Sequence, residues 1–335
     1  MDDVGVRPLP RRPLGRTGRS TTAIGLGLAA LGRPGYLTLG RDDDLGPDRS
    51  VEAMRRRTWE VLDEARRLGI GHVDVARSYG RAEELLAGWL VDRQVAPDEL
   101  TVSTKWGYTY VGGWRVDVEV HEVKDHSLAT LRRQLPETLE LLGPWLDVEQ
   151  IHSATLDTGV LDDDAVLDAL AAVRDEGRVV GLSTSGPGQG DVVRRALEVE
   201  RGGRPLFGTV QSTWNVLEPS VGPALADAHD AGLGVIVKEA VANGRLTPHG
   251  ALAPEQRSLL AAAVDGAPPV DQIALAAALA QPWADVVLSG AVTVDQLASN
   301  AAAVDLVDRV DVDALDRLAE PAGTYWATRA AQPWT

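Results

Sequence analysis

The 335-residue sequence predicts an α/β protein, a closed (β/α)8 TIM barrel. From residue 50 onward, amphipathic stretches of helical periodicity alternate with short Val/Ile/Leu runs. This alternation indicates a parallel sheet, and eight such units over about 250–300 residues favour a closed barrel over an open sheet. No change in composition marks a linker, so residues 1–335 are expected to form one domain.

Eight short apolar runs are the expected strands, and helical stretches separate them. The strands are residues 21–27, 72–76, 101–105, 145–152, 179–183, 208–213, 234–238 and 285–289. The helices are residues 51–68, 82–92, 127–142, 162–177, 190–201, 219–231, 270–281 and 294–304. Gly69 is a plausible C-cap and Ser127 an N-cap. Residues 305–335 are expected to be a tail that carries Tyr325, Trp326 and Trp334.

The segment GLGLAA, residues 25–30, matches the G-x-G-x-x-A fingerprint of dinucleotide-binding folds. That fingerprint also needs a helix that begins within the glycines, so that a phosphate meets the helix N-terminus. Here the segment LGRPGYLTLG follows, which is rich in helix breakers, and no helix is expected before about residue 50. We interpret GLGLAA as a barrel strand that runs into a glycine-rich loop.

Composition and charge exclude several classes of function. The chain has no cysteine, so disulfides, thiolate nucleophiles and cysteine-bound metals are excluded. The formal net charge of −16 argues against nucleic acid and anionic membranes as partners. No apolar stretch reaches the ~20 residues that a bilayer span needs, and residues 1–16 lack the apolar core of an export signal. We therefore expect a cytoplasmic protein.

Polar side chains stand at nearly every predicted strand exit, where such barrels carry their chemistry. Asp74 lies in the second strand and Tyr79 just after it, while Lys105 ends the third strand and His152 the fourth. The later exits carry Ser183, Thr184, Gln211, Trp214, Lys238 and Ser289. Each residue alone has an ordinary structural explanation, but the first four together indicate a catalytic site.

The chemistry of these four residues is specific. A carboxylate in a buried strand is costly unless it is paired, and Lys105 on the neighbouring strand is the obvious partner of Asp74. A nearby ammonium would favour the phenolate of Tyr79 and lower its pKa. With His152 directing the substrate oxygen, the set could protonate an oxygen that gains negative charge, as in carbonyl reduction by hydride.

These residues, in this order, resemble the aldo-keto reductase family, and the likeness covers nearly the whole chain. HVDVARSYGRAEELLAGWL is similar to the family's first signature, VSTKWG to its lysine strand and WLDVEQIH to its histidine strand. RPLGRTGRSTTAIGLG resembles the opening segment, and VVGLSTS, TVQSTWNVLEP and LSGAVTVDQLASN resemble the cofactor-binding segments.

The resemblance implies an NAD(P)H-dependent oxidoreductase that reduces an aldehyde, ketone or sugar carbonyl, or oxidises the matching alcohol. Tyr79 would be the general acid, supported by Asp74, Lys105 and His152. Ser183, Thr184 and Gln211 would face the nicotinamide. The remaining candidates for cofactor binding are Lys238, Arg245, Ser289, Gly290, Gln296 and Asn300.

The sequence departs from the family pattern at several of these positions. Thr184 stands where the family often has Asn, and Lys238 where an aromatic residue stacks on the nicotinamide. Lys238 could lie along the ring by its methylenes or contact a phosphate. Gly290 and Gln296 stand where basic residues hold the 2′-phosphate of NADP, which leaves Arg245 as the nearest basic candidate. The family therefore favours NADP(H), while the local charge leaves NAD(H) open.

The connection at residues 106–127 is long for such a barrel, and long loops there are often functional. Trp106 and Trp114 lead us to expect an aromatic wall over the nicotinamide, suited to a sugar or ring-bearing carbonyl. The alternative is that these aromatic residues only pack the loop. His121, Glu122, Asp125 and His126 of this loop could suggest a metal, but no second ligand cluster accompanies them, so no metal is expected.

Two other classes of protein remain as alternatives. A nucleotide-binding regulatory barrel with little turnover would share the fold and the cofactor, although the intact set of four argues for catalysis. A metal-dependent barrel hydrolase or isomerase would need several His and carboxylate ligands at strand ends, where only His152 stands.

Overall fold

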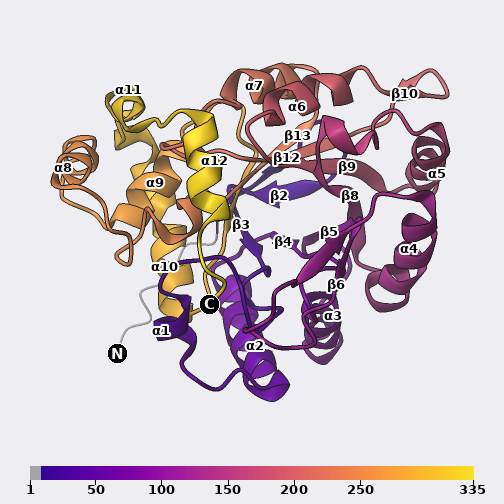
Figure 1. Cartoon of the computed structure of the whole chain (residues 1–335), viewed down its shortest axis with the longest axis horizontal. Coiled ribbons are helices and arrows are strands. Elements are labelled where there is room, and N and C mark those ends of the chain that lie inside the picture. Colours follow the sequence, from indigo (N-terminus) through magenta and orange to yellow (C-terminus); the bar gives the residue numbers. More distant parts are fainter. Residues whose placement is uncertain (1–8) are drawn as a thin grey trace.

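A computed structural model describes residues 9–335 and shows a closed barrel of eight parallel strands (Figure 1). In barrel order the strands are β3 (Ile24–Gly27), β4 (His72–Asp74), β5 (Thr101–Trp106), β8 (Leu146–Ala154), β9 (Val179–Thr184), β12 (Thr209–Thr213), β13 (Gly234–Lys238) and β14 (Val286–Ser289). The pairing of β14 with β3 closes the barrel. The predicted fold class is confirmed.

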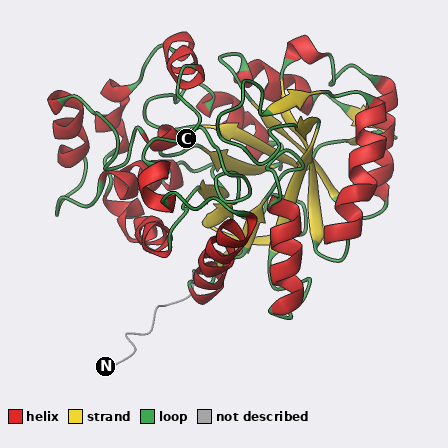
Figure 2. Ribbon diagram, turned by 60° about the horizontal axis from the view of Figure 1, so that its bottom comes forward, coloured by secondary structure: helices red, strands yellow, loops and turns green. Residues whose placement is uncertain are grey.

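Eight helices surround the strands, as predicted (Figure 2). They are α2 (Val51–Arg67), α3 (Ala82–Asp92), α4 (Leu128–Leu142), α5 (Asp164–Asp175), α6 (Gln189–Leu197), α7 (Gly222–Asp230), α9 (Val270–Leu279) and α10 (Val294–Ala302). The Ser127 side chain caps α4 by accepting from the Thr130 N–H. Gly69 follows α2 with a φ of 74°, a conformation that glycine adopts without steric cost.

Several elements were not predicted, and most of them lie in the loops. They are the hairpins β1/β2 (Arg11–Pro13, Ser20–Thr22), β6/β7 (Tyr108–Tyr110, Glu122–Lys124) and β10/β11 (Glu200–Arg201, Arg204–Pro205); the helices α1 (Arg41–Leu45), α8 (Pro254–Ala262), α11 (Val312–Leu315) and α12 (Ala322–Ala330); and the 3₁₀ turns Leu156–Thr158, Ala242–Gly244, Ala303–Arg309 and Asp316–Leu318. Residues 305–335 are therefore not a plain tail. Figure 1 shows α8 and α11 outside the ring of eight helices.

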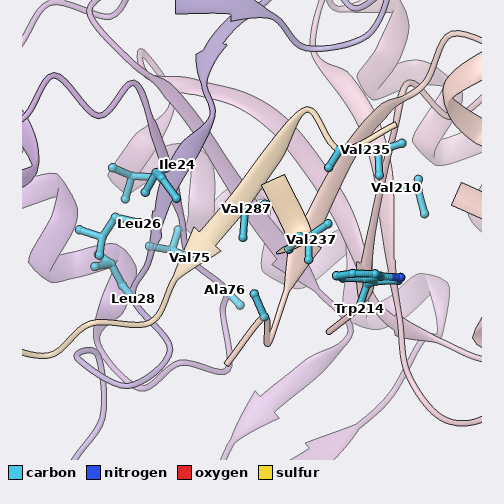
Figure 3. Packing of buried hydrophobic residues seen from close by; sticks show 14 of the residues in the cluster. Ile24, Leu26, Leu28, Val75, Ala76, Val210, Trp214, Val235, Val237 and Val287 are labelled. Carbon is cyan, nitrogen blue, oxygen red and sulfur yellow. The ribbon is translucent and has the colours of Figure 1, made fainter. Parts of the chain in front are cut away.

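Two apolar layers position the site. Strand side chains that point outward, among them Leu26, Val237 and Val287, are fully buried and belong to the core between barrel and helices (Figure 3). Inside the barrel, Leu14 from the β1/β2 hairpin lies against Gly234, the first residue of β13, and closes the amino end of the barrel. The polar interior residues therefore collect toward the carboxyl end, where the strands exit.

The segment after β3 is a loop, which agrees with our interpretation of GLGLAA as a barrel strand that runs into a glycine-rich loop. Residues 28–40 form turns and bends, and the next helix is the short α1, so no helix begins within the glycines. Within residues 9–335, no helix is both long and apolar enough to cross a membrane. The prediction that residues 1–16 are not an export signal stays a prediction, since residues 1–8 lie outside the described part of the chain.

Candidate active site

Asp74 is the centre of a buried polar layer inside the barrel. It ends β4, its side chain is 3% exposed, and it forms an ion pair with Lys105 of β5. Its Oδ1 also accepts from Ser103 Oγ at 2.7 Å and, across the barrel, from Gln211 Nε2 at 2.9 Å. Several donors to one carboxylate offset the cost of burying its charge. The predicted pairing with Lys105 is present.

Tyr79, Lys105 and His152 lie together above this layer. The Lys105 ammonium lies 4.9 Å from the centroid of the Tyr79 ring and also donates to the Val75 carbonyl at 3.0 Å. The rings of Tyr79 and His152 meet edge to face, with centroids 5.4 Å apart. Three neighbouring strands thus bring the four predicted residues into one place, because the carboxyl ends of parallel strands share one end of a barrel.

The protonation states follow from burial. Burial raises the pKa of Tyr79 well above its ordinary value of 10 and Asp74 raises it further, whereas Arg33 lowers it. The expectation that Lys105 gives this tyrosine a low pKa is therefore wrong, because burial dominates. Burial also lowers the pKa of Lys105, which Asp74 opposes. Burial, followed by the charges of Lys105 and Arg33, holds the pKa of His152 well below its usual range, so its imidazole is neutral at pH 7.

A cavity of about 200 Å³ opens above the tetrad of Asp74, Tyr79, Lys105 and His152. Its described lining includes three members of this tetrad and several residues that were not predicted to lie at the site. These additional residues are Arg33, Tyr36, Glu122, Glu239, Arg329 and Trp334. The Tyr79 hydroxyl makes no hydrogen bond within residues 9–335, so it remains available to a molecule in the cavity.

Arg33 is the most informative of the missed residues. Its side chain is 3% exposed, and its guanidinium lies over the rings of Tyr36, Tyr79 and Trp334 at 4.8–5.1 Å. Its Nη1 donates to Glu122 Oε2 at 2.8 Å. The signal in the sequence is weak, because Arg33 stands in the breaker-rich loop GRPGY and reaches the cavity only through the fold.

The predicted nicotinamide residues do not all face the cavity. Ser183 lines it, but Thr184 points to the other side of β9, where its hydroxyl contacts Ser212 Oγ at 2.7 Å. Successive residues of a strand point to opposite faces, so only one of the two can line the interior. Gln211 lines the cavity while its amide donates to Asp74.

Lys238 and Arg245 are each held by other residues of the chain. Lys238 lines the cavity, and its Nζ donates to Thr213 Oγ1 at 2.6 Å. Burial lowers its pKa to about 8. The Lys238 ammonium is thus bonded to the end of the neighbouring strand β12. Arg245 forms an ion pair with Glu320 and does not line the cavity, so the structure does not bring it to the site.

The expected aromatic wall is formed by other residues. Trp106 is fully buried beneath the loop, next to His126, and Trp114 donates from its indole to the Arg49 carbonyl at 2.8 Å. Neither lines the cavity. The aromatic lining comes instead from Tyr36, Tyr79 and Trp334.

Three of the four predicted residues of the eighth unit line a second cavity of about 380 Å³. Ser289 Oγ donates to Asn300 Oδ1 at 2.7 Å, which fixes the orientation of that amide. Gly290, Gln296 and Asn300 are part of the second lining, while Ser289 lines the first cavity. Thr38, Val241 and Gly290 line both cavities, so the two are neighbours and share a wall.

Within residues 9–335, no group of three or more histidine, aspartate or glutamate side chains is placed to hold a metal ion. In the loop that contains β6 and β7, His121 stacks on Trp334 and Glu122 binds Arg33. His126 contacts the His152 carbonyl at 2.8 Å through its Nε2. These residues join the loop to the cavity walls.

Fold and site together define a (β/α)8-barrel protein with a buried Asp–Tyr–Lys–His set at the carboxyl end of the strands. The model of the Aldo/keto reductase family matches residues 23–320, so the chain belongs to that family.

The relatives include two dehydrogenases. The chain is 27% identical to the L-galactose dehydrogenase of Arabidopsis thaliana over an alignment of 330 residues, and this alignment covers 90% of each chain. It is 29% identical to the pyridoxal 4-dehydrogenase of Microbacterium luteolum over an alignment of 163 residues, which covers 42% of each chain. A putative aldo-keto reductase from Pseudomonas aeruginosa matches with a TM-score of 0.63 at 25% identity, covering 89% of this chain and 95% of that chain. The holo form of an aldo-keto reductase from Bacillus halodurans shares the fold, with a TM-score of 0.71 at 22% identity over 94% and 97% of the two chains.

Proposed function

We propose that the protein is an NAD(P)H-dependent oxidoreductase that reduces an aldehyde, ketone or sugar carbonyl, or oxidises the matching alcohol. The observation that carries this proposal is the Tyr79 hydroxyl, which has no hydrogen-bond partner within residues 9–335 and stands at a cavity that also holds a neutral His152. Family membership and the two dehydrogenase relatives support the same reaction class.

In this proposal Tyr79 gives its proton to the substrate oxygen as that oxygen gains charge. Its raised pKa keeps the phenol protonated at neutral pH. Asp74 keeps Lys105 charged, and the ammonium over the ring stabilises the phenolate that forms. His152 Nδ1 lies 3.4 Å from Ser78 Oγ, which leaves Nε2 to contact the substrate oxygen.

The residues present fit a nicotinamide dinucleotide, which supplies or accepts the hydride when it is bound. The two cavities are neighbours, which suits a ligand with two ends. A Cβ added to Gly290 would meet nothing within 4 Å, so the backbone there is open to a ligand. Asn243 lines the first cavity, and its Oδ1 is buried without a hydrogen-bond partner in the described chain.

The test combines binding with turnover. Purified protein is titrated with NADH and NADPH by calorimetry, and the nicotinamide absorbance is then followed with a panel of aldehydes, ketones and sugars. We expect binding of at least one nucleotide and turnover of at least one carbonyl. Tyr79→Phe should lose roughly 10²–10⁴-fold in kcat, because the proton donor is gone, with an unchanged nucleotide Kd.

Two other results would point elsewhere. Nucleotide binding without turnover of any substrate would favour the alternative, a regulatory barrel that holds a cofactor. Failure to bind either nucleotide would sink the proposal. Loss of both binding and activity in Tyr79→Phe would show that Tyr79 has a structural role.

A further inference from the structure

The second cavity is negatively charged. Helices α1 and α10 and the loop after β13 contribute to its walls, together with Pro269 and Asp271. Among the described residues of the lining, the carboxylates are Asp44, Asp271 and Asp295, and the cations or potential cations are Arg41 and His249. A ligand that carries an extra phosphate at this end would therefore meet more negative than positive groups.

Arg41 is not available to such a phosphate. Its guanidinium donates five hydrogen bonds, two to the Ala30 carbonyl and one each to the carbonyls of Arg33, Pro34 and Thr335. A guanidinium has five N–H donors, so all of them are used. Arg41 is also 1% exposed, which places it behind the wall as a structural residue.

Asp44 holds a fixed position in the wall. Gln296 accepts from the Val292 N–H at 2.9 Å through Oε1, so its amide nitrogen must point the other way. That nitrogen donates to Asp44 Oδ2 at 2.7 Å. His249 Nε2 lies 3.4 Å from Asp44 Oδ1, so this potential cation faces Asp44.

Asp271 and Asp295 differ from Asp44 in their surroundings. Asp271 Oδ2 accepts from Ser299 Oγ at 3.0 Å and Asn300 Nδ2 at 2.9 Å, so it serves to hold those two side chains. Asp295 is exposed in the first turn of α10. Asp44 is therefore the partly buried carboxylate that is held in place beside Gln296.

We propose that the protein is specific for NAD(H), and that Asp44 is the residue that excludes the 2′-phosphate of NADP(H). The inference rests on the proposed function. Gln296 stands at a position that the family resemblance gives to the 2′-phosphate, and here it holds a carboxylate. A carboxylate accepts a hydrogen bond from a ribose hydroxyl and repels a phosphate. The family resemblance alone favours NADP(H), and this inference reverses that preference.

The first experiment uses the unaltered chain. Calorimetric titrations compare NADH with NADPH, and 5′-AMP with adenosine 2′,5′-bisphosphate, which isolates the adenosine end. We expect at least tenfold tighter binding of NADH and of AMP than of their 2′-phosphorylated counterparts. The difference should narrow at high salt, since salt screens the repulsion. Equal or tighter binding of NADPH would overturn the inference and leave the proposed function standing, whereas binding of neither nucleotide would overturn both.

The second experiment assigns the effect to Asp44. Asp44→Asn keeps a hydrogen-bond acceptor for Gln296 and removes the charge, and Asp44→Ser removes the carboxylate. Either variant should reduce the ratio of the Kd for NADPH to the Kd for NADH at least fivefold, and Gln296→Arg added to Asp44→Ser should reduce it further. The matched control is Asp43→Asn, an exposed residue of the same helix outside the lining. If Asp44→Asn and Asp44→Ser keep the ratio of the Asp43→Asn control, Asp44 is not the determinant. If the variants fail to fold, the fragment titrations of the unaltered chain still decide whether the adenosine end excludes a 2′-phosphate.

Discussion

The Arg33 guanidinium lies 5.1 Å from the centroid of the Tyr79 ring, about as near as the Lys105 ammonium at 4.9 Å. The proposed proton donor therefore has two cations beside it, one from β5 and one from the loop after β3. Arg33 lowers the pKa of Tyr79, against the larger effect of burial. Its contribution matters most in the oxidation direction, where Tyr79 must give up its proton before it can act as a base.

Replacement of Arg33 by methionine should therefore slow alcohol oxidation. Loss of the cation raises the pKa of Tyr79 further, so the rising limb of kcat against pH should move to higher pH. We expect roughly a tenfold lower rate near pH 8, with most of the activity retained in Arg33→Lys. Arg81→Met is the matched control, since Arg81 is half exposed and pairs with Glu84. A limb that stays in place in Arg33→Met would mean that Arg33 only packs the cavity wall.

Asp74→Asn should weaken both stability and turnover. The variant leaves the Lys105 ammonium buried without its counter-ion, a situation that costs about 3–5 kcal/mol in free energy of unfolding. Since Asp74 is what raises the pKa of Lys105 against burial, the variant also favours the neutral amine beside Tyr79. Urea unfolding and kcat measure the two effects. Asp74→Asn combined with Lys105→Met should be less destabilised than the sum of the single variants. Full activity in Asp74→Asn would refute a functional ion pair.

The barrel and its tetrad were predictable because the signals are local. Strands and helices have their own periods in the sequence, and a parallel barrel necessarily gathers its strand ends. This is why Asp74, Lys105 and His152 could be placed together without a structure. Two errors were avoidable by the same reasoning. Lys105 points inward, so the next residue, Trp106, must point outward. In the same way Ser183 points inward, so Thr184 must point outward.

The remaining lining residues could not be placed from the sequence. Arg33, Glu122 and Trp334 belong to three segments far apart in the chain, and they meet only through tertiary contacts. Arg41 fastens two of these segments, since it donates to carbonyls near Arg33 and to that of Thr335. Arg245 is a further case, because its partner Glu320 lies 75 residues away. Long-range pairing of this kind leaves no periodic signal.

Glu239 should make the protein sensitive to acid. Although burial acts to raise it, Arg329 and Lys238 lower the pKa of Glu239 to about 2, against an ordinary value of 4.5. The ionised Glu239 therefore stabilises the folded protein above pH 4.5. This contribution, about 3 kcal/mol in the free energy of unfolding, is lost as pH falls from 4.5 toward 2. Glu239→Gln should be less stable than the unaltered chain at neutral pH. Its free energy of unfolding should also fall less between pH 4.5 and 2, as measured by urea unfolding across pH. The exposed Glu84→Gln serves as the control, and an unchanged acid transition in Glu239→Gln would contradict the assignment.

Glu149 is a buried carboxyl that has no hydrogen bond in the described part of the chain. Its neighbours on β8 face the barrel interior, where Val148 joins the apolar cluster and Gln150 contacts Asp74, so Glu149 faces the helices. Both of its carboxyl oxygens are buried without a partner among the described residues. Burial, followed by the charge of Glu83, raises the pKa of Glu149 well above its ordinary value of 4.5.

Glu149→Leu should therefore stabilise the protein. Because the folded-state pKa is raised, the folded chain binds this proton more tightly than the unfolded chain, and stability is lost as pH rises above 4.5. An apolar residue of similar size removes that loss, so the free energy of unfolding at pH 7 should rise by about 1–3 kcal/mol. Urea unfolding between about pH 5 and 8 should show a smaller decline with pH for Glu149→Leu than for the unaltered chain. The exposed Glu140→Leu on α4 should leave the decline unchanged. A Glu149→Leu protein that is less stable at pH 8 would show that the carboxylate is satisfied there by groups such as bound water.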